Sequence, residues 1–158
     1  VAAPAGAGGK GKGPQVERPY REITFIDRTI GDCDSSNPPL VVCDFELSGV
    51  LIGTHIGRAE EFGRGTATLD FSRTCVGPDG STGNPTVADF SGVIIASDGS
   101  ELFYEASIPQ CFTGSLEGER DGSWHIVGGT GRFEGATGTI DLGPLIDGST
   151  VNTGTITF

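Results

Sequence analysis

Hydrophobic and polar residues alternate along most of the chain after residue 19. Runs rich in Val, Ile, Thr and Phe are separated by turn signals such as "GPDGSTGNP", "SDGS" and "IDGS". A period of two residues is the pattern of β-strands, whereas no window of useful length repeats at helical spacing. Eight strands are therefore predicted, with little helix, over residues 20–30, 41–56, 63–75, 86–96, 101–109, 123–129, 136–143 and 150–158.

The short connections between these runs indicate that neighbouring strands are antiparallel. Eight such strands can close into a β-barrel, which leaves no sheet edge exposed. We therefore predict an all-β fold, an eight-stranded antiparallel closed barrel, over residues 19–158. Residues 1–18 are dominated by Gly, Pro and Lys, a composition typical of a disordered tail.

Two glycine-rich segments raise the question of nucleotide binding. Residues 6–12, "GAGGKGK", match the first seven positions of a P-loop, but Gly13 stands where a metal-binding Ser or Thr is required. In "WHIVGGTGRFEGATGTI", residues 124–140, a dinucleotide fingerprint would need glycine at position 134, which is Glu134. These glycines instead indicate tight backbone turns or bulges between two strands.

The same segment resembles the "GGTG-x-[FY]-x-x-A-x-G" signature of the allene oxide cyclase and dirigent-protein barrel superfamily. The likeness covers residues 89–142 with some specificity, and the residues that carry it are Gly128, Gly129, Gly131, Phe133 and Gly135. The resemblance implies a barrel with a lipocalin-like interior cavity, and several members form trimers. It transfers no catalytic residue, because the motif consists of backbone-shaping positions.

Strand alternation predicts which side chains point inward. Aromatic residues expected to line the interior are Phe45, Phe71 and Phe90. Three polar residues interrupt the same face: His55, Arg73 and Tyr104. They are candidate ligand-binding residues at a cavity mouth; alternatively, His55 is half-exposed at a strand end, Arg73 extends to the rim and Tyr104 fills the core. Trp124 either lines a pocket or caps the barrel, and His125 is expected on the surface.

The opposite face carries the carboxylates, so no buried pair of carboxylates is predicted. These are Glu46, Asp70, Asp89, Glu101 and Glu105. That face also carries apolar residues: Val50, Ile52, Val93 and Ile95. Either a bulge at Gly49 or Gly53 reverses the alternation, or a second subunit covers the patch in a homo-oligomer, a trimer or a dimer.

Composition restricts the class of partner. The net charge of −11 disfavours nucleic acid, which requires a basic surface, and no apolar run is long enough for a membrane-spanning helix. Four cysteines without a CxxC motif predict two disulfides rather than a metal site. Of the three possible connectivities, Cys33–Cys43 with Cys75–Cys111 is favoured, because the first bridge closes a short loop and the second joins two strand ends. With a start at Val1, these features favour a secreted mature chain, although a trimmed chain would look the same. No cofactor is expected.

Three functions remain open at this point. The first is a secreted barrel that binds a small hydrophobic molecule in its interior. The second, implied by the resemblance, is a cyclase or isomerase that controls the conformation of a hydrophobic substrate. The third is a structural protein whose barrel is filled by side chains. Whether the protein is an enzyme is left open, and the volume of the interior separates the third function from the others.

Overall fold

The computed structural model describes residues 14–114 and 121–158, which are all-β with one turn of 3-10 helix. The predicted tail, residues 1–18, lies mostly outside these ranges, and the P-loop-like segment, residues 6–12, lies wholly outside them. The elements are β1 (Glu17–Asp34), β2 (Leu40–Gly53), β3 (Gly57–Asp70), β4 (Cys75–Val76), β5 (Thr82–Ala96), β6 (Glu101–Phe112), β7 (Ser123–Gly129), η1 (Gly131–Phe133), β8 (Thr137–Asp141), β9 (Leu145–Ile146) and β10 (Ser149–Thr157).

The strands form one antiparallel sheet that closes on itself. The main strands follow the order β1-β2-β3-β5-β6-β7-β8-β10, and β10 pairs again with β1. The pairing of β1 with β10 runs from Glu17↔Thr157 to Phe25↔Ser149, so the first and last strands form the seam of the ring. The predicted all-β, antiparallel class is confirmed, and each of the eight predicted strands corresponds to one strand of this ring.

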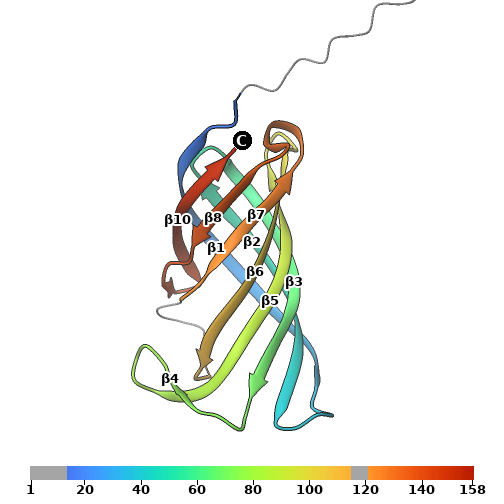
Figure 1. The fold of residues 1–158 in the computed structure, drawn as a ribbon, viewed down its shortest axis with the longest axis vertical. Helices are drawn as coiled ribbons and strands as arrows, with labels where there is room; N and C mark the ends of the chain where they lie inside the picture. The colour runs from blue at the N-terminus through green and yellow to red at the C-terminus, as the bar shows by residue number, and fades with distance from the viewer. Residues whose placement is uncertain (1–13, 115–120) are drawn as a thin grey trace, which may run out of the picture.

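The ring is closed over only part of its length (Figure 1). Beyond residue 25, β1 pairs only with β2, and beyond Ala106 the described part of β6 pairs only with β5. We call the level at which all eight main strands pair the closed half. We call the parts of β1, β2, β3, β5 and β6 that extend further the open half; it lies at the lower end of Figure 1.

One large hydrophobic cluster makes up most of the interior of the closed half. Its large members include Leu51, Ile94, Leu102, Ile140 and Ile156, all with 1% exposure or less. A second, smaller cluster of Phe45, Leu47 and Ala88 lies towards the open half, and the half-buried Phe90 packs against both. Burial of this apolar surface is the main force that holds the ring together.

One predicted strand was placed wrongly along the chain. Residues 63–75 were expected as a strand, but β3 spans Gly57–Asp70. Asp70 ends it, because its carboxylate accepts hydrogen bonds from the backbone N–H and the hydroxyl of Ser72. Such a side-chain turn competes with the strand ladder. Phe71 and Arg73 therefore lie beyond the strand and are both exposed.

The outer apolar residues do not result from a reversed alternation. The register of β2 with β3 is unbroken from Leu40 to Gly53, so no bulge occurs at Gly49 or Gly53. Val50, Val93 and Ile95 are half-buried on the outer face, and Ile52 is 53% exposed. The explanation by a bulge is therefore wrong.

Both predicted disulfides, Cys33–Cys43 and Cys75–Cys111, are present, and no cysteine is free. Cys33 and Cys43 lie opposite each other on β1 and β2. The second bridge joins β4 to β6 across the end of the open half. Two disulfides are compatible with an extracellular protein. Within the described ranges, no helix has the length and apolar character needed to cross a lipid bilayer.

The glycine-rich segment shapes the backbone at the closed end, as its sequence predicts. Gly131 and Gly135 have φ of 59° and 74°, in the left-handed region that favours glycine. Between them, η1 places the fully buried Phe133 over the end of the core. A Cβ at Gly129 would lie 2.5 Å from the Glu101 carbonyl oxygen, whereas one at Gly128 would meet only Phe103, at 3.8 Å.

This contrast between adjacent glycines gives a matched test. We expect Gly129→Ala to lower the free energy of unfolding by about 1–3 kcal/mol, because the backbone of β6 must move away from the new methyl group. Gly128→Ala should change it by less than about 0.5 kcal/mol. Urea denaturation of both variants measures the difference. Equal effects of the two substitutions would show that close backbone approach does not set the requirement for glycine.

Candidate functional site

A cluster of buried polar side chains lies inside the closed half, centred on Glu22 of β1. The Glu22 carboxylate accepts hydrogen bonds from the Tyr20 hydroxyl at 2.6 Å, from Thr24 Oγ1 at 3.1 Å and from Asn152 Nδ2 at 2.8 Å. Glu22 itself is only 2% exposed. Hydrogen bonds to an ionised group are the strong ones, and three of them offset part of the cost of burying this carboxylate.

Strand alternation and the seam together place this network. Tyr20, Glu22 and Thr24 are alternate residues of β1 and so share its inner face. The register pairs Glu22 with Asn152 across the seam. Asn152 is oriented in turn, because its Oδ1 accepts hydrogen bonds from the Thr150 hydroxyl at 3.0 Å and the Gly143 N–H at 3.1 Å.

A second carboxylate, Glu61 of β3, is also buried, at 9% exposure. Glu61 faces Tyr104 of β6. Burial is the largest cause of the raised pKa of the Tyr104 phenol, and the negative charge of Glu61 is the second largest. The Tyr104 hydroxyl is buried but has no partner that satisfies hydrogen-bond geometry among the described residues. It lies over Gly63 and Gly92, where an added Cβ would come within 2.6 and 2.5 Å of it.

Burial dominates the titration of the cluster. Desolvation raises the pKa of Glu22 above its ordinary value, although the hydrogen bonds from Tyr20, Asn152 and Thr24 act in the opposite direction. The pKa of the Tyr20 phenol is raised first by burial and second by the negative charge of Glu22. The site therefore favours the neutral forms of both groups, and Glu22 is a carboxyl that can hold a proton at a higher pH than an exposed glutamate.

Arg28 extends the site towards the open half. Its guanidinium carbon lies 5.3 Å from the centre of the Phe45 ring, and its Nε is buried without a hydrogen-bond partner among the described residues. Burial lowers the pKa of this guanidinium, and no carboxylate contributes to the shift. Arg28 is therefore a cation in a mainly apolar setting without a neutralising partner in the described part of the chain.

These groups surround an internal cavity of about 40 Å³. Its lining consists of Glu22, Ile26, Arg28, Leu47, Glu61, Ala88, Phe90, Tyr104, Ile108, Gln110, Trp124, Leu142 and Asn152. Such a volume and several convergent polar groups suit ordered water or one end of a larger molecule. Small-molecule sites usually occupy about 300–1,000 Å³, so a whole ligand does not fit in the closed half.

Half of the predicted ligand-binding residues reach this interior. Phe90 and Tyr104 line the cavity, and Phe45 is buried beneath Arg28. Trp124 also lines it, between the rings of Tyr20 and Tyr104 at centroid distances of 6.5 and 5.3 Å. Of the two roles considered for Trp124, lining a pocket is the one observed.

The other three residues lie elsewhere. His55 occupies the exposed turn between β2 and β3 with φ of 70°, and its Nε2 is 3.1 Å from the Pro19 carbonyl oxygen. Phe71 is 56% exposed, and the carbonyl of the exposed Arg73 accepts a hydrogen bond from Asn84. The positions of Phe71 and Arg73 follow from the early end of β3, at Asp70. His125 is exposed, as predicted.

The expectation that no carboxylate pair is buried was wrong, since Glu22 and Glu61 both face the cavity. Sequence reasoning also missed Arg28 and Asn152. The signal for Glu22 and Arg28 was present, because both continue the alternation that starts at Tyr20. The signal for Glu61 was hidden, because the first half of β3 was not recognised as a strand.

Comparisons with known proteins leave the chain unassigned: no protein family matches it, and no curated protein matches it either. Among the described residues, no group of three or more His, Cys, Asp or Glu side chains is arranged to hold a metal ion. The site must therefore be interpreted from its own geometry.

The raised pKa of Glu22 predicts a pH-dependent contribution to stability. A group whose pKa is raised on folding stabilises fully below its unfolded pKa, and this contribution is lost as the pH rises through the folded pKa. Wild type should therefore lose stability relative to Glu22→Gln as the pH rises above about 4.5, the ordinary pKa of a glutamate, by at most about 1.4 kcal/mol per pH unit. Urea denaturation of both proteins at a series of pH values measures this difference in the free energy of unfolding. Glu46→Gln, at an exposed position, is the control, and parallel curves for wild type and Glu22→Gln would contradict the prediction.

Proposed function

We propose that this is a secreted β-barrel protein of lipocalin-like architecture that binds a small, largely apolar molecule with an anionic head group. In this proposal the head group binds Arg28 and the apolar part lies along the inner face of the open half. The protein acts as a binding protein. Kinship with the allene oxide cyclase and dirigent-protein superfamily is part of the proposal.

The ring closure supports the barrel. Eight main strands pair around a common hydrophobic core, and the seam between β1 and β10 leaves no free edge at that level. The resemblance at residues 128–135 agrees with it, since those glycines shape a turn that caps the core. The two disulfides support secretion, because such bonds persist in oxidising compartments.

The distribution of free space supports this position of the ligand. The cavity, which extends from Glu22 in the closed half to Arg28 in the open half, offers about 40 Å³, enough for a head group only. The inner face of the open half is apolar: Leu47, Ala88, Phe90 and Ile108 line the cavity on that side. Ile30, at the far end of the same face of β1, is 55% exposed. An apolar chain along this surface would cover the side chain of Ile30, which otherwise faces water.

Arg28 is the observation that carries the proposal. Burying a charge without a partner is costly, so a half-buried guanidinium is expected where an anion completes the site. The planar guanidinium suits a carboxylate or a similar oxyanion, which it can bind through two parallel hydrogen bonds. Gln110, another residue of the same lining, offers an amide donor.

A second candidate function is catalysis of ring closure or isomerisation in such a molecule. The observation that favours it is Glu22, whose raised pKa allows it to hold a proton at the cavity wall. The buried Tyr104 hydroxyl, which faces Glu61, would orient a polar atom of the substrate. Confinement of a flexible chain would contribute through positioning. Glu22→Gln separates the two functions, because it should abolish conversion and leave the affinity at Arg28 unchanged.

The test compares two probes that differ in the head group. Isothermal titration calorimetry with decanoate and with decanol should show tighter binding of decanoate by wild type. Arg28→Met should weaken decanoate binding by about tenfold or more, because a charge-assisted hydrogen bond is lost, and should change decanol binding little. Arg21→Met, at an exposed arginine on the outer face of β1, is the matched control. Equal affinity of wild type and Arg28→Met for decanoate would contradict the proposal.

A further inference from the structure

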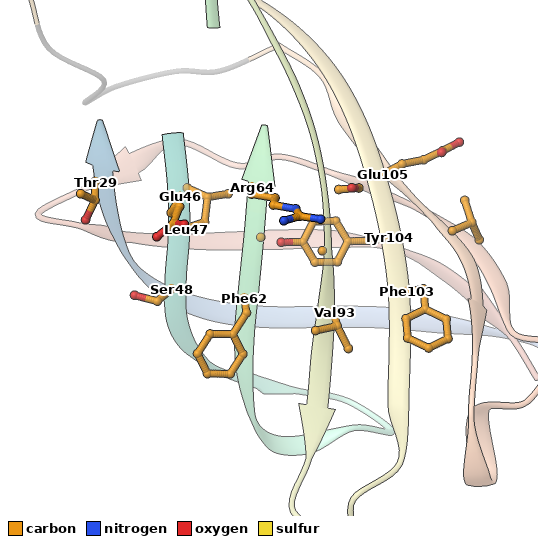
Figure 2. Close-up of a pocket in the computed structure, with 14 residues that line it drawn as sticks. Thr29, Glu46, Leu47, Ser48, Phe62, Arg64, Val93, Phe103, Tyr104 and Glu105 are labelled. Atoms are coloured by element: carbon orange, nitrogen blue, oxygen red, sulfur yellow. The ribbon is translucent and has the colours of Figure 1, made fainter. Parts of the chain in front are cut away.

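The outer surface of the ring carries a groove of about 620 Å³ that the proposed ligand does not use (Figure 2). It crosses β2, β3, β5, β6 and β7. Its side chains form two rows, one above the other in the figure. The apolar row holds Phe62, Val93 and Phe103, and the polar row holds Glu46, Arg64 and Glu105.

The strand register fixes both rows. In the polar row, Glu46, Arg64, Ser91, Glu105 and His125 are successive partners from β2 to β7. In the apolar row, Ser48, Phe62, Val93, Phe103 and Gly128 are partners in the same order. Val127, beside Gly128, is left over at a register shift and is 52% exposed. We call these two rows the β5-centred face.

The central charges of the β5-centred face, those of Arg64 and Glu105, are antisymmetric about β5. Arg64, one strand before β5, mirrors Glu105, one strand after it. The apolar row is symmetric, because Phe62 mirrors Phe103 and Val93 lies in the centre. Such a pattern is self-complementary: a two-fold axis along β5 brings opposite charges and matching apolar groups together.

Arg64 is available for such a contact. Its guanidinium makes no ion pair with any described residue, although Glu46 is opposite it on β2. Figure 2 shows its side chain reaching from β3 towards β5 and over the groove. The two phenylalanines of the face are 45% and 37% exposed, a high value for aromatic side chains. An exposed apolar row beside an unpaired cation is typical of an interaction site.

We propose that the β5-centred face is the interface of a two-fold symmetric homodimer. Arg64 pairs with Glu105 of the partner subunit, Phe62 packs on Phe103 of the partner subunit, and Val93 lies at the axis. Because a closed two-fold interface repeats each contact, two Arg–Glu pairs form. They counter the repulsion between chains that each carry a net charge of −11.

Charge exchange between the two strands provides the test. Sedimentation velocity from about 1 µM to about 1 mM should show wild type passing from monomer to dimer. Arg64→Glu and Glu105→Arg should each weaken the dimer by about tenfold or more, since each places like charges together. The double variant Arg64→Glu/Glu105→Arg should restore it, because the pairs reform with reversed polarity. Rescue also shows that the single variants fail by charge rather than by misfolding.

Two further variants sharpen the result. Arg21→Glu reverses a charge on β1, which β2 and β3 separate from β5, and should leave the dimer unchanged. The next row along the strands places Glu60 and Glu101 symmetrically about β5, where like charges face each other at the rim of the interface. Glu101→Lys should therefore tighten the dimer.

Several outcomes would overturn the proposal. These are a monomer over the whole concentration range, a trimer, a dimer that both single reversals leave intact, or a double variant as weak as the single ones. None of them bears on ligand binding at Arg28, so the two proposals fail independently.

Discussion

The hydrogen bond from Asn152 to Glu22 joins the last strand to the first, inside the seam that closes the sheet. The backbone pairing of β1 with β10 closes the ring, and strand alternation then forces Glu22 inward. A buried carboxylate without donors is very costly. Tyr20 and Thr24 of the same strand donate in any register of the seam, whereas Asn152 donates only in the register that pairs it with Glu22. A slip by one residue between β1 and β10 would turn one strand over relative to the other and separate Asn152 from Glu22. The polar cluster therefore specifies the register of closure, and the cavity exists because that register holds.

The interior is small despite 27 glycines in the chain. Several inward-facing glycines make room for a neighbouring aromatic ring rather than for a ligand. Gly63 and Gly92 lie directly under the Tyr104 hydroxyl, and Gly53 lies under that of Tyr20. The rings fill the space that the missing side chains leave, and the cavity keeps about 40 Å³. For this reason the chain-like molecule, as proposed, would lie in the open half, where β1 and β6 lose their partners on one side.

Much of the architecture could be predicted from alternation and turn residues, since both act over a few neighbouring positions. The eight strands, the two disulfides and the inward positions of Phe45, Phe90 and Tyr104 followed from such local signals. The limits of β3 could not be predicted from such local signals. Its first half contains "RAEEF", in which Glu61 is buried by contacts from other strands, and a local pattern cannot show this. The side-chain turn at Asp70 then excluded Phe71 and Arg73 from the interior.

The inner and outer faces of β3, β5 and β6 can carry separate functions, because alternation assigns neighbouring residues to opposite sides. Tyr104 closes the wall from inside while Phe103 and Glu105, its neighbours in sequence, face outward. Gly63 and Gly92 stand between Tyr104 and the outer groove, so the wall is thin at that point. A second copy on the β5-centred face, as proposed, would cover this thin part of the wall. It would lower the local dielectric around Tyr104 and Glu61 and so strengthen the interactions of the buried polar cluster. The proposed dimerisation and the integrity of the interior would thus be connected through one wall, although their contacts are made by different side chains.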